Sequence, residues 1–207
     1  MSRLAAPTVF LDAFAADPTS RGVSIAIRAA AVLLMTGLIA AAAQVSFSIP
    51  FTTIPFTMQP MLVLMTGMAL GARLGTSAQV LYLAAGIAGL PVFAASATLP
   101  MGAARLLGPT GGYLLAYPIA AFVCGWLAER GMDRRYSTSV LAMLAGLTVI
   151  YAGGVSWLAA LSGIVSGEPA AGWSYAMAAG FYPFVLADVA KVLVAAGRIA
   201  AAWRLFR

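Results

Sequence analysis

The sequence predicts an all-α integral membrane protein with six transmembrane helices and both termini in the cytoplasm. The first observation is composition: of 207 residues, 62% are hydrophobic and 9% are charged, whereas soluble domains carry about 25% charged residues. The second is length, because a helix needs about 20 residues to cross ~30 Å of hydrocarbon, which leaves room for about six spans. The third is the placement of the arginines, which requires an even number of spans.

Residues 1–22 precede the predicted membrane domain, which covers residues 23–207. Asp12, Asp17, Pro7 and Pro18 interrupt this segment, where a secretory signal would have a clean apolar core behind a basic start. We therefore expect a cytoplasmic segment that is not a signal peptide. A short interfacial helix over residues 8–16 and a disordered tail both fit its composition.

Six apolar segments follow in order. The first, residues 23–45, has no charge after Arg28. The second, residues 57–70, is short, and the run GARLG at 71–75 predicts a tight turn into a third segment that ends near residue 90. The fourth covers residues 109–128, the fifth 137–165 and the last 183–202. Pro183 suits the first turn of the last helix, where its missing N–H costs nothing.

The arginines predict the orientation. With six spans and cytoplasmic termini, the outer side holds only Arg105, and an excess of Lys and Arg marks cytoplasmic loops. Membrane orientation therefore explains the net charge of +6 better than nucleic-acid binding does. The cytoplasmic side holds Arg3, Arg21, Arg28, Arg73, Arg130, Arg134, Arg135, Arg198, Arg204 and Arg207.

Scarce residue types exclude several kinds of site. The chain has no His, one Cys at position 124 and one Lys at position 191. Cys124 has no partner for a disulfide or a thiolate metal site, and we expect a small buried hydrophobe there. A phosphate-binding GxxxxGK[ST] loop is impossible because the only Lys follows Ala190. We expect no metal, no cofactor and no enzymatic activity.

Three connections lie on the outer side in this topology. Residues 46–57, SFSIPFTTIPFT, contain two prolines and no charge, so they favour a segment that folds down over an apolar cavity, with an ordinary interfacial loop as the alternative. Residues 91–112 form the second connection. Residues 166–182, with Gly167, Glu168, Pro169 and Gly172, read as a plain surface loop.

The run GPTGGY at residues 108–113 opens the fourth helix. Pro109 presets the first turn, and Gly111 and Gly112 remove side chains where a ligand or another helix could touch backbone. Free N–H groups at a helix start attract a carboxylate. Close packing of helices explains the same glycines equally well, because small residues are favoured at membrane helix contacts.

Asp188 and Lys191 place opposite charges three residues apart within the apolar run VLADVAKVLV. On a helix these positions share a face, and each charge at mid-bilayer costs ~2.5–3.5 kcal/mol on insertion scales. The pair must therefore face the protein interior, ~7 and ~12 Å below the outer end of the last helix. A structural ion pair and a proton relay are alternatives, and a polar ligand is the favoured interpretation.

The chain resembles the BioY family, the biotin-capturing membrane subunit of energy-coupling-factor (ECF) vitamin transporters. Its GPTGGYLL run, the Pro-Val-Phe after the third span and the DxxK pair match in combination. The resembling stretches are AAAAQVSFSIPFTTIPFTMQP (40–60), LGARLGTSAQVLYLAAGIAGLPVFA (70–94), LLGPTGGYLLAYPIAAFVCGWLAE (106–129) and FVLADVAKVLVA (184–195).

The resemblance implies a six-helix substrate-binding (S) component with high affinity for biotin, whose outer pocket is capped by the loop between the first two helices. Asp188 and Lys191 are then expected at the ureido ring, which offers two N–H donors and one carbonyl. Thr53, Thr57, Gln59 and Tyr82 are candidates to line the pocket. For the valerate carboxylate the candidates are Arg105 and the N–H groups near Gly111 and Gly112, with Tyr113 beside them.

The resemblance also implies partners: a transmembrane coupling subunit and two cytoplasmic ATPases, in the cytoplasmic membrane of a bacterium. Docking through small residues on the first helix points to the pairs Thr36–Ala40 and Gly37–Ala41. Two other hypotheses stay open. One is an S-component for a different vitamin, and the other is a proton-coupled carrier or membrane enzyme that uses Asp188, although no internal repeat supports a carrier.

Overall fold

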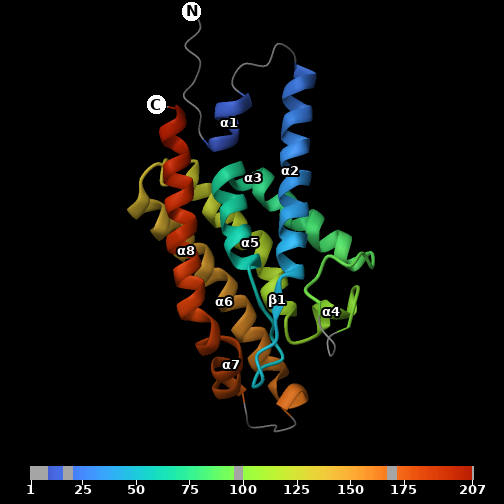
Figure 1. The fold of residues 1–207 in the computed structure, drawn as a ribbon. Helices are drawn as coiled ribbons and strands as arrows, with labels where there is room; N and C mark the ends of the chain where they lie inside the picture. The colour runs from blue at the N-terminus through green and yellow to red at the C-terminus, as the bar shows by residue number, and fades with distance from the viewer. Residues whose placement is uncertain (1–8, 16–20, 96–99, 167–171, 207) are drawn as a thin grey trace, which may run out of the picture.

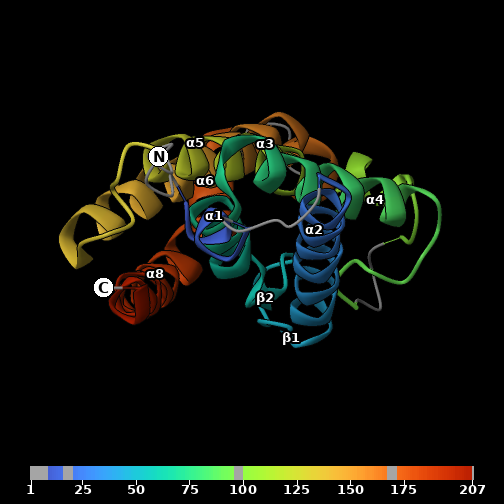
Figure 2. The same ribbon diagram turned by 90° about the horizontal axis from the view of Figure 1, so that it is seen from above.

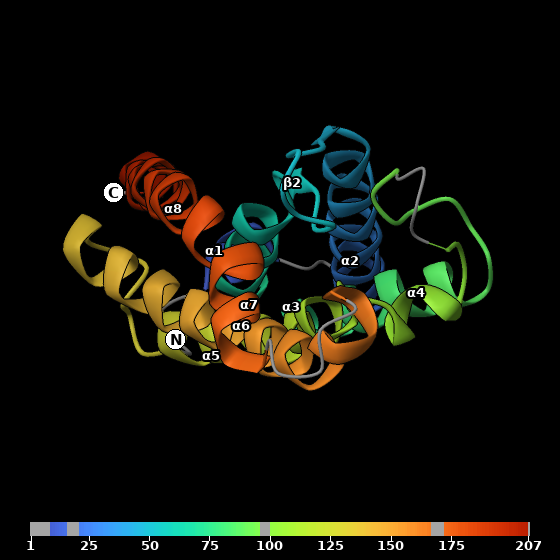
Figure 3. The same ribbon diagram turned by 90° about the horizontal axis from the view of Figure 1, so that it is seen from below.

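The computed structural model describes residues 9–15, 21–95, 100–166 and 172–206. Its helices form an open arc in which α2, α3, α5, α6 and α8 follow one another (Figures 2 and 3). Along the axes of the long helices, α1 and the end of α8 lie at one end of the molecule, and the strands and α7 lie at the other (Figure 1). We refer to these as the α1 end and the hairpin end.

The long helices are α2 (Arg21–Gln44), α3 (Gln59–Ile87), α5 (Gly111–Ala128), α6 (Tyr136–Ser166) and α8 (Tyr182–Ala202). The short elements are α1 (Phe10–Ala15), β1 (Ser46–Phe47), β2 (Phe56–Thr57), α4 (Ala104–Leu107), α7 (Gly172–Gly180) and the 3₁₀ turn η1 (Trp203–Phe206). The first four long helices are long and apolar enough to cross a membrane. α8 has the length for a span but carries Asp188, Lys191 and Arg198.

α3 contains the predicted tight turn. Its backbone leaves helical geometry at Gly71, with φ 82° and ψ 177°, a conformation that glycine adopts without strain. A Cβ added to Gly75 would lie 2.9 Å from the Cα of Gly67, although eight helical residues would separate them by ~12 Å. The two arms of α3 therefore fold against each other, and Glu129 Oε1 accepts the Ala72 N–H at 2.8 Å across the turn.

Small residues hold α3 and α5 together. A Cβ on Gly67 would lie 2.3 Å from the Ala121 carbonyl oxygen, and one on Gly125 would lie 2.3 Å from the Ala72 nitrogen. Backbones that approach this closely exclude larger side chains, as is usual in membrane helix pairs. Cys124 is buried in this contact as expected and its thiol points to the Ala142 carbonyl.

Within the expected N-terminal segment, residues 10–15 form the short helix α1. The expectation of a plain surface loop at 166–182 is wrong for residues 172–180. These residues form the helix α7, which buries Ala176, Ala179 and Gly180. Apolar residues at a spacing of three to four drive this packing, whereas Gly167, Glu168 and Pro169 lie outside the described residues.

The end of α8 is tied to the α5–α6 connection through Asp133. The Trp203 indole donates to Asp133 Oδ2 at 2.6 Å, and the Phe10 ring lies edge-on to Trp203 with centroids 6.2 Å apart. Asp133 is fully buried. Burial raises the pKa of its carboxyl to about 6, although the indole hydrogen bond and nearby Arg134 favour the charged form.

We expect Asp133→Asn to change how stability depends on pH. The folded carboxyl binds its proton more tightly than the unfolded one, whose pKa is 3.8. Its contribution to the free energy of unfolding therefore falls between about pH 4 and pH 6 and is constant above. Asn keeps an acceptor for Trp203, so the variant should gain stability relative to the parent across that interval. Thermal unfolding in detergent at several pH values measures this, and a difference independent of pH contradicts it.

Candidate ligand-binding site

A cavity lies beneath the β1–β2 hairpin, enclosed by the start of α3, α4, α5, α6 and α8. Its walls are mainly aromatic and aliphatic, and they include Phe56, Phe93, Tyr117, Ile150 and Phe184. The polar groups that reach it come from Thr57, Gln59, Arg105, Thr110, Tyr113, Tyr151, Asp188 and Lys191. A mainly apolar lining with a limited set of polar groups is the usual composition of a small-molecule site.

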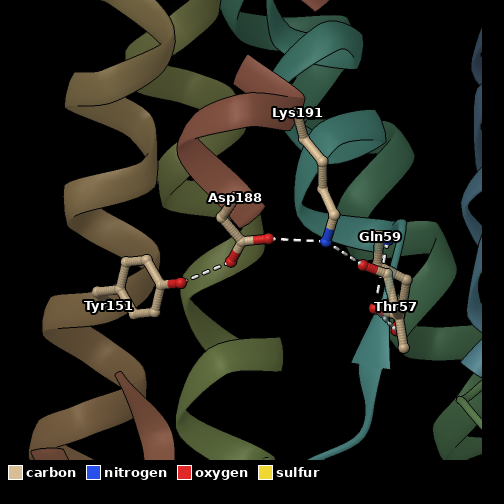
Figure 4. A network of polar contacts seen from close by, with 5 residues as sticks. All are labelled: Thr57, Gln59, Tyr151, Asp188 and Lys191. Atoms are coloured by element: carbon tan, nitrogen blue, oxygen red, sulfur yellow. Dashed lines mark hydrogen bonds and ion pairs between the residues drawn. The ribbon is translucent and has the colours of Figure 1, made fainter. Parts of the chain in front are cut away.

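Asp188 and Lys191 form a buried ion pair on the wall of this cavity (Figure 4). Lys191 Nζ lies 2.8 Å from Asp188 Oδ1, and the Tyr151 hydroxyl donates to Asp188 Oδ2 at 2.6 Å. Both carboxylate oxygens are thus hydrogen-bonded, which offsets part of the cost of removing the charge from water. Sequence reasoning missed Tyr151, because a tyrosine in an apolar span is ordinarily a packing residue.

Lys191 also joins α8 to the hairpin. Its ammonium donates to the backbone carbonyl of Thr57 at 2.7 Å, and it lies 3.8 Å from the centroid of the Phe56 ring. These contacts come from residues at the end of β2, so the expected folding of residues 46–57 over a cavity is confirmed. The ammonium group of Lys191 thus contacts both the hairpin and Asp188.

Thr57 and Gln59 line the cavity as expected, but Tyr82 does not. The Gln59 amide donates to the Tyr82 hydroxyl at 2.7 Å, and that hydroxyl donates to the Val92 carbonyl at 3.1 Å. Tyr82 is fully buried on α3. It therefore orients Gln59 from behind, and its expected place in the lining is corrected.

Thr53 was also expected in the lining, and this is wrong. Thr53 is exposed at the tip of the hairpin. Its neighbour Thr52 turns inward, and the Thr52 hydroxyl donates to the Ala179 carbonyl of α7 at 2.6 Å. The reason is that successive residues of the hairpin point in different directions, and only the position of α7 decides which of the two threonines is held.

Gly111 and Gly112 are absent from the lining, so of the two interpretations the structure favours packing. A Cβ on Gly111 would lie 1.9 Å from the Leu106 carbonyl oxygen, and one on Gly112 would lie 2.2 Å from Trp157 Cβ. The Gly111 N–H is already bonded to the Gly108 carbonyl at 3.0 Å. Tyr113 does line the cavity, and its hydroxyl donates to the Gly180 carbonyl at 2.8 Å.

Arg105 is buried on α4 and lines the cavity. Its Nη2 donates to the Ala94 carbonyl. Its Nη1 is buried and has no hydrogen-bond partner among the described residues. A buried guanidinium nitrogen that is left unsatisfied is costly, so this end of the cavity is suited to an anionic group.

On α2, the two predicted docking pairs face different ways. Thr36 donates to the Ala78 carbonyl of α3 at 3.1 Å, and Ala40 is partly buried. Gly37 and Ala41 are exposed, and nothing lies within 4 Å of a Cβ added to Gly37. The expectation that Thr36 faces a partner is therefore corrected, because its hydroxyl is used within the chain.

The cavity has a volume of about 60 Å³. Sites for small organic ligands measure about 300–1,000 Å³. A ligand of that size therefore requires side chains around the cavity to move.

Comparison with known proteins places this geometry in a family. The sequence matches the BioY family over residues 16–207. It is 38% identical over 164 residues to the probable biotin transporter BioY of Pyrococcus horikoshii, covering 79% of this chain and 88% of that protein. It is also 38% identical over 163 residues to the biotin transporter BioY of Thermotoga maritima, with the same coverage.

A solved structure has the same fold. The crystal structure of the S-component for biotin from an ECF-type ABC transporter superposes with a TM-score of 0.75, covering 90% of this chain and 95% of that one at 22% identity. On the sequence match across nearly the whole chain, this protein belongs to the BioY family.

Proposed function

We propose that this chain binds biotin with high affinity and serves as the substrate-specific membrane subunit of an ECF transporter. The observation that carries the proposal is the buried Asp188–Lys191 pair on the wall of a capped cavity, in a member of the BioY family. Relatives named as biotin transporters support the choice of biotin over another vitamin.

The proposed topology has six spans with both termini in the cytoplasm of a bacterium. α2, the two arms of α3, α5, α6 and α8 supply the six, because the turn at Gly71 divides α3. The α1 end is then cytoplasmic and the hairpin end faces outward. The count of arginines supports this orientation.

The ureido ring of biotin is proposed to lie at the α8 side of the cavity. Asp188 accepts from a ring N–H, and Lys191 donates to the ring carbonyl in place of the Thr57 carbonyl. Ligand and hairpin thus compete for one ammonium group. The aromatic walls, including Phe56 and Phe184, enclose the apolar thioether ring and chain.

The proposed partners are a transmembrane coupling subunit and two cytoplasmic ATPases. The exposed face of α2 at Gly37 and Ala41 is open to another helix. Transport energy comes from the ATPases in this proposal, because the single lysine of the chain is occupied at the cavity. Copurification of tagged coupling subunits with this chain, and its loss in Gly37→Leu, would test the contact.

A direct binding titration of the purified chain tests the function. Biotin is expected to bind, whereas thiamine and riboflavin at the same concentrations are not. Mass spectrometry of small molecules that copurify gives an independent answer. Saturable binding of another vitamin without binding of biotin would replace this proposal by the second hypothesis, an S-component of different specificity.

Arg105→Gln is expected to weaken binding of biotin by about 1.5–3 kcal/mol, the usual worth of a hydrogen bond to a charged group. Gln is uncharged but keeps a donor. Biotinamide lacks the carboxylate, so its affinity should change little in the same variant. An equal loss for biotin and biotinamide would mean that Arg105 shapes the cavity without contacting the carboxylate.

A further inference from the structure

A second hollow lies at the α1 end, between the start of α6 and the end of α8, far along both helices from the ion pair. It has a volume of about 390 Å³ and is lined by Arg134, Arg135, Tyr136, Ala200, Trp203 and Arg204. We call it the arginine cleft. Three of its six lining residues are cationic and none is acidic, and none of them belongs to the proposed biotin site.

Trp203, which lines the arginine cleft, is fixed in position by its neighbours. Trp203 is buried and held by its bond to Asp133 at 2.6 Å. The Arg134 guanidinium carbon lies 5.1 Å from the centroid of the Trp203 ring, within the range of a cation–π contact. Tyr136 packs over Gly197 of α8, where an added Cβ would lie 3.8 Å from its ring. The residues that line the cleft are therefore positioned by contacts of the α5–α6 connection and α6 with α8 and η1.

Arg135 and Arg204 bring two positive charges to the arginine cleft. Arg135 and Arg204 are exposed, and they approach the hollow from the α5–α6 connection and from η1. Like charges around one hollow repel each other, and no carboxylate of the described residues lines it. A phosphate group would neutralise them, because guanidinium groups donate to phosphate oxygens in a fixed, paired geometry.

The position of the cleft along the membrane indicates where that phosphate comes from. α6 has 31 residues, a length of ~46 Å against ~30 Å of hydrocarbon, so its first turns reach the headgroup region. Tyr and Trp are enriched at that level. Toward the membrane centre, Leu141 of α6 and Leu193 and Val194 of α8 are exposed apolar side chains suited to acyl chains.

We propose that the arginine cleft binds the phosphate of an anionic phospholipid headgroup from the leaflet at the α1 end. Basic pockets between the cytoplasmic ends of membrane helices take up such headgroups. A bound lipid would join the start of α6 to the end of α8. This site is independent of biotin binding.

The full-length chain in a neutral detergent tests the proposal. Thermal unfolding midpoints are measured with added phosphatidylglycerol, with phosphatidylcholine and with inorganic phosphate at equal concentrations. Phosphatidylglycerol alone is expected to raise the midpoint. In R135Q/R204Q the concentration that gives half the rise should increase at least about tenfold. The matched control is R21Q/R73Q, which removes two exposed arginines outside the cleft and should respond like the parent.

Three results would overturn the lipid site. The first is an equal response to phosphatidylglycerol in both double variants, which means a diffuse surface charge effect. The second is an equal rise with inorganic phosphate, which means a free phosphate site. The third is that R135Q/R204Q responds to phosphatidylglycerol like the parent but no longer copurifies with the coupling subunits. That result would make the arginine cleft a contact for a protein partner. Normal biotin binding by R135Q/R204Q shows that this variant is folded. If its yield is too low, the single variants R135Q and R204Q are compared with the parent by native mass spectrometry of bound phosphatidylglycerol. Fewer bound lipids are expected in each single variant.

Discussion

Replacing Asp188 with Asn is expected to weaken biotin binding by about 1–3 kcal/mol, the usual cost of leaving a buried polar group unsatisfied. The amide is nearly the same size and can still accept from the Tyr151 hydroxyl. It removes the negative charge opposite Lys191, and with it the strong acceptor proposed for a ureido N–H. The loss should appear with biotin and with biotinamide alike, which separates this effect from that of Arg105.

A calorimetric or fluorescence titration of the purified variant measures the change. The control is Asp12→Asn, which removes a carboxylate from an ion pair with Arg28 at 3.0 Å but lies at the α1 end. Affinity should be unchanged in that control. If the Asp188 variant also keeps the parental affinity, the ion pair serves the fold alone and the proposed ureido site is wrong.

Replacing Lys191 with Met is expected to cost more, about 3–5 kcal/mol of folding stability, because it leaves Asp188 as an uncompensated buried charge. It also removes the bond from α8 to the Thr57 carbonyl. The hairpin should then be held less firmly over the cavity. Biotin binding should be lost together with the donor to the ureido carbonyl.

The double variant Asp188→Asn/Lys191→Met separates stability from binding. With both charges removed, most of the lost stability should return, because replacing a whole buried ion pair is often neutral or stabilising. Binding should not return. Denaturation in detergent measures the first quantity and a biotin titration the second, with Arg73→Met as a control for loss of an exposed cation. Equal instability of the single and double variants would contradict the charge argument.

The larger elements of the fold could be predicted because they follow from local patterns. Apolar runs of the length of a bilayer specify helices, and the five long helices begin and end within a few residues of the predicted bounds. Gly71 specifies the turn of α3 because only a glycine takes its positive φ readily. α7 was missed because its nine residues are too short for a span and follow a run rich in glycine and proline.

The candidate site could be predicted for those side chains whose exposure to lipid costs much free energy. Charges among hydrocarbon must turn inward, so Asp188 and Lys191 could be placed in the protein interior from their cost and spacing, and the structure puts them on the cavity wall. Threonine, glycine and tyrosine carry no such penalty. For this reason Thr53, Tyr82, Gly111 and Gly112 were assigned to the lining although they are absent from it, and Tyr151 was missed although it is present.

By itself the sequence determined that the chain belongs in a membrane, which residues form the long helices, and that one ion pair faces the interior. These properties depend on the transfer of side chains between water and lipid, which is additive along a helix. Only the tertiary structure decided that Tyr151 donates to Asp188, that Lys191 binds the hairpin, and that arginines from the α5–α6 connection and from η1 share one hollow. Those properties depend on distances of about 3 Å between residues far apart in the chain, and such distances are set only when the helices pack.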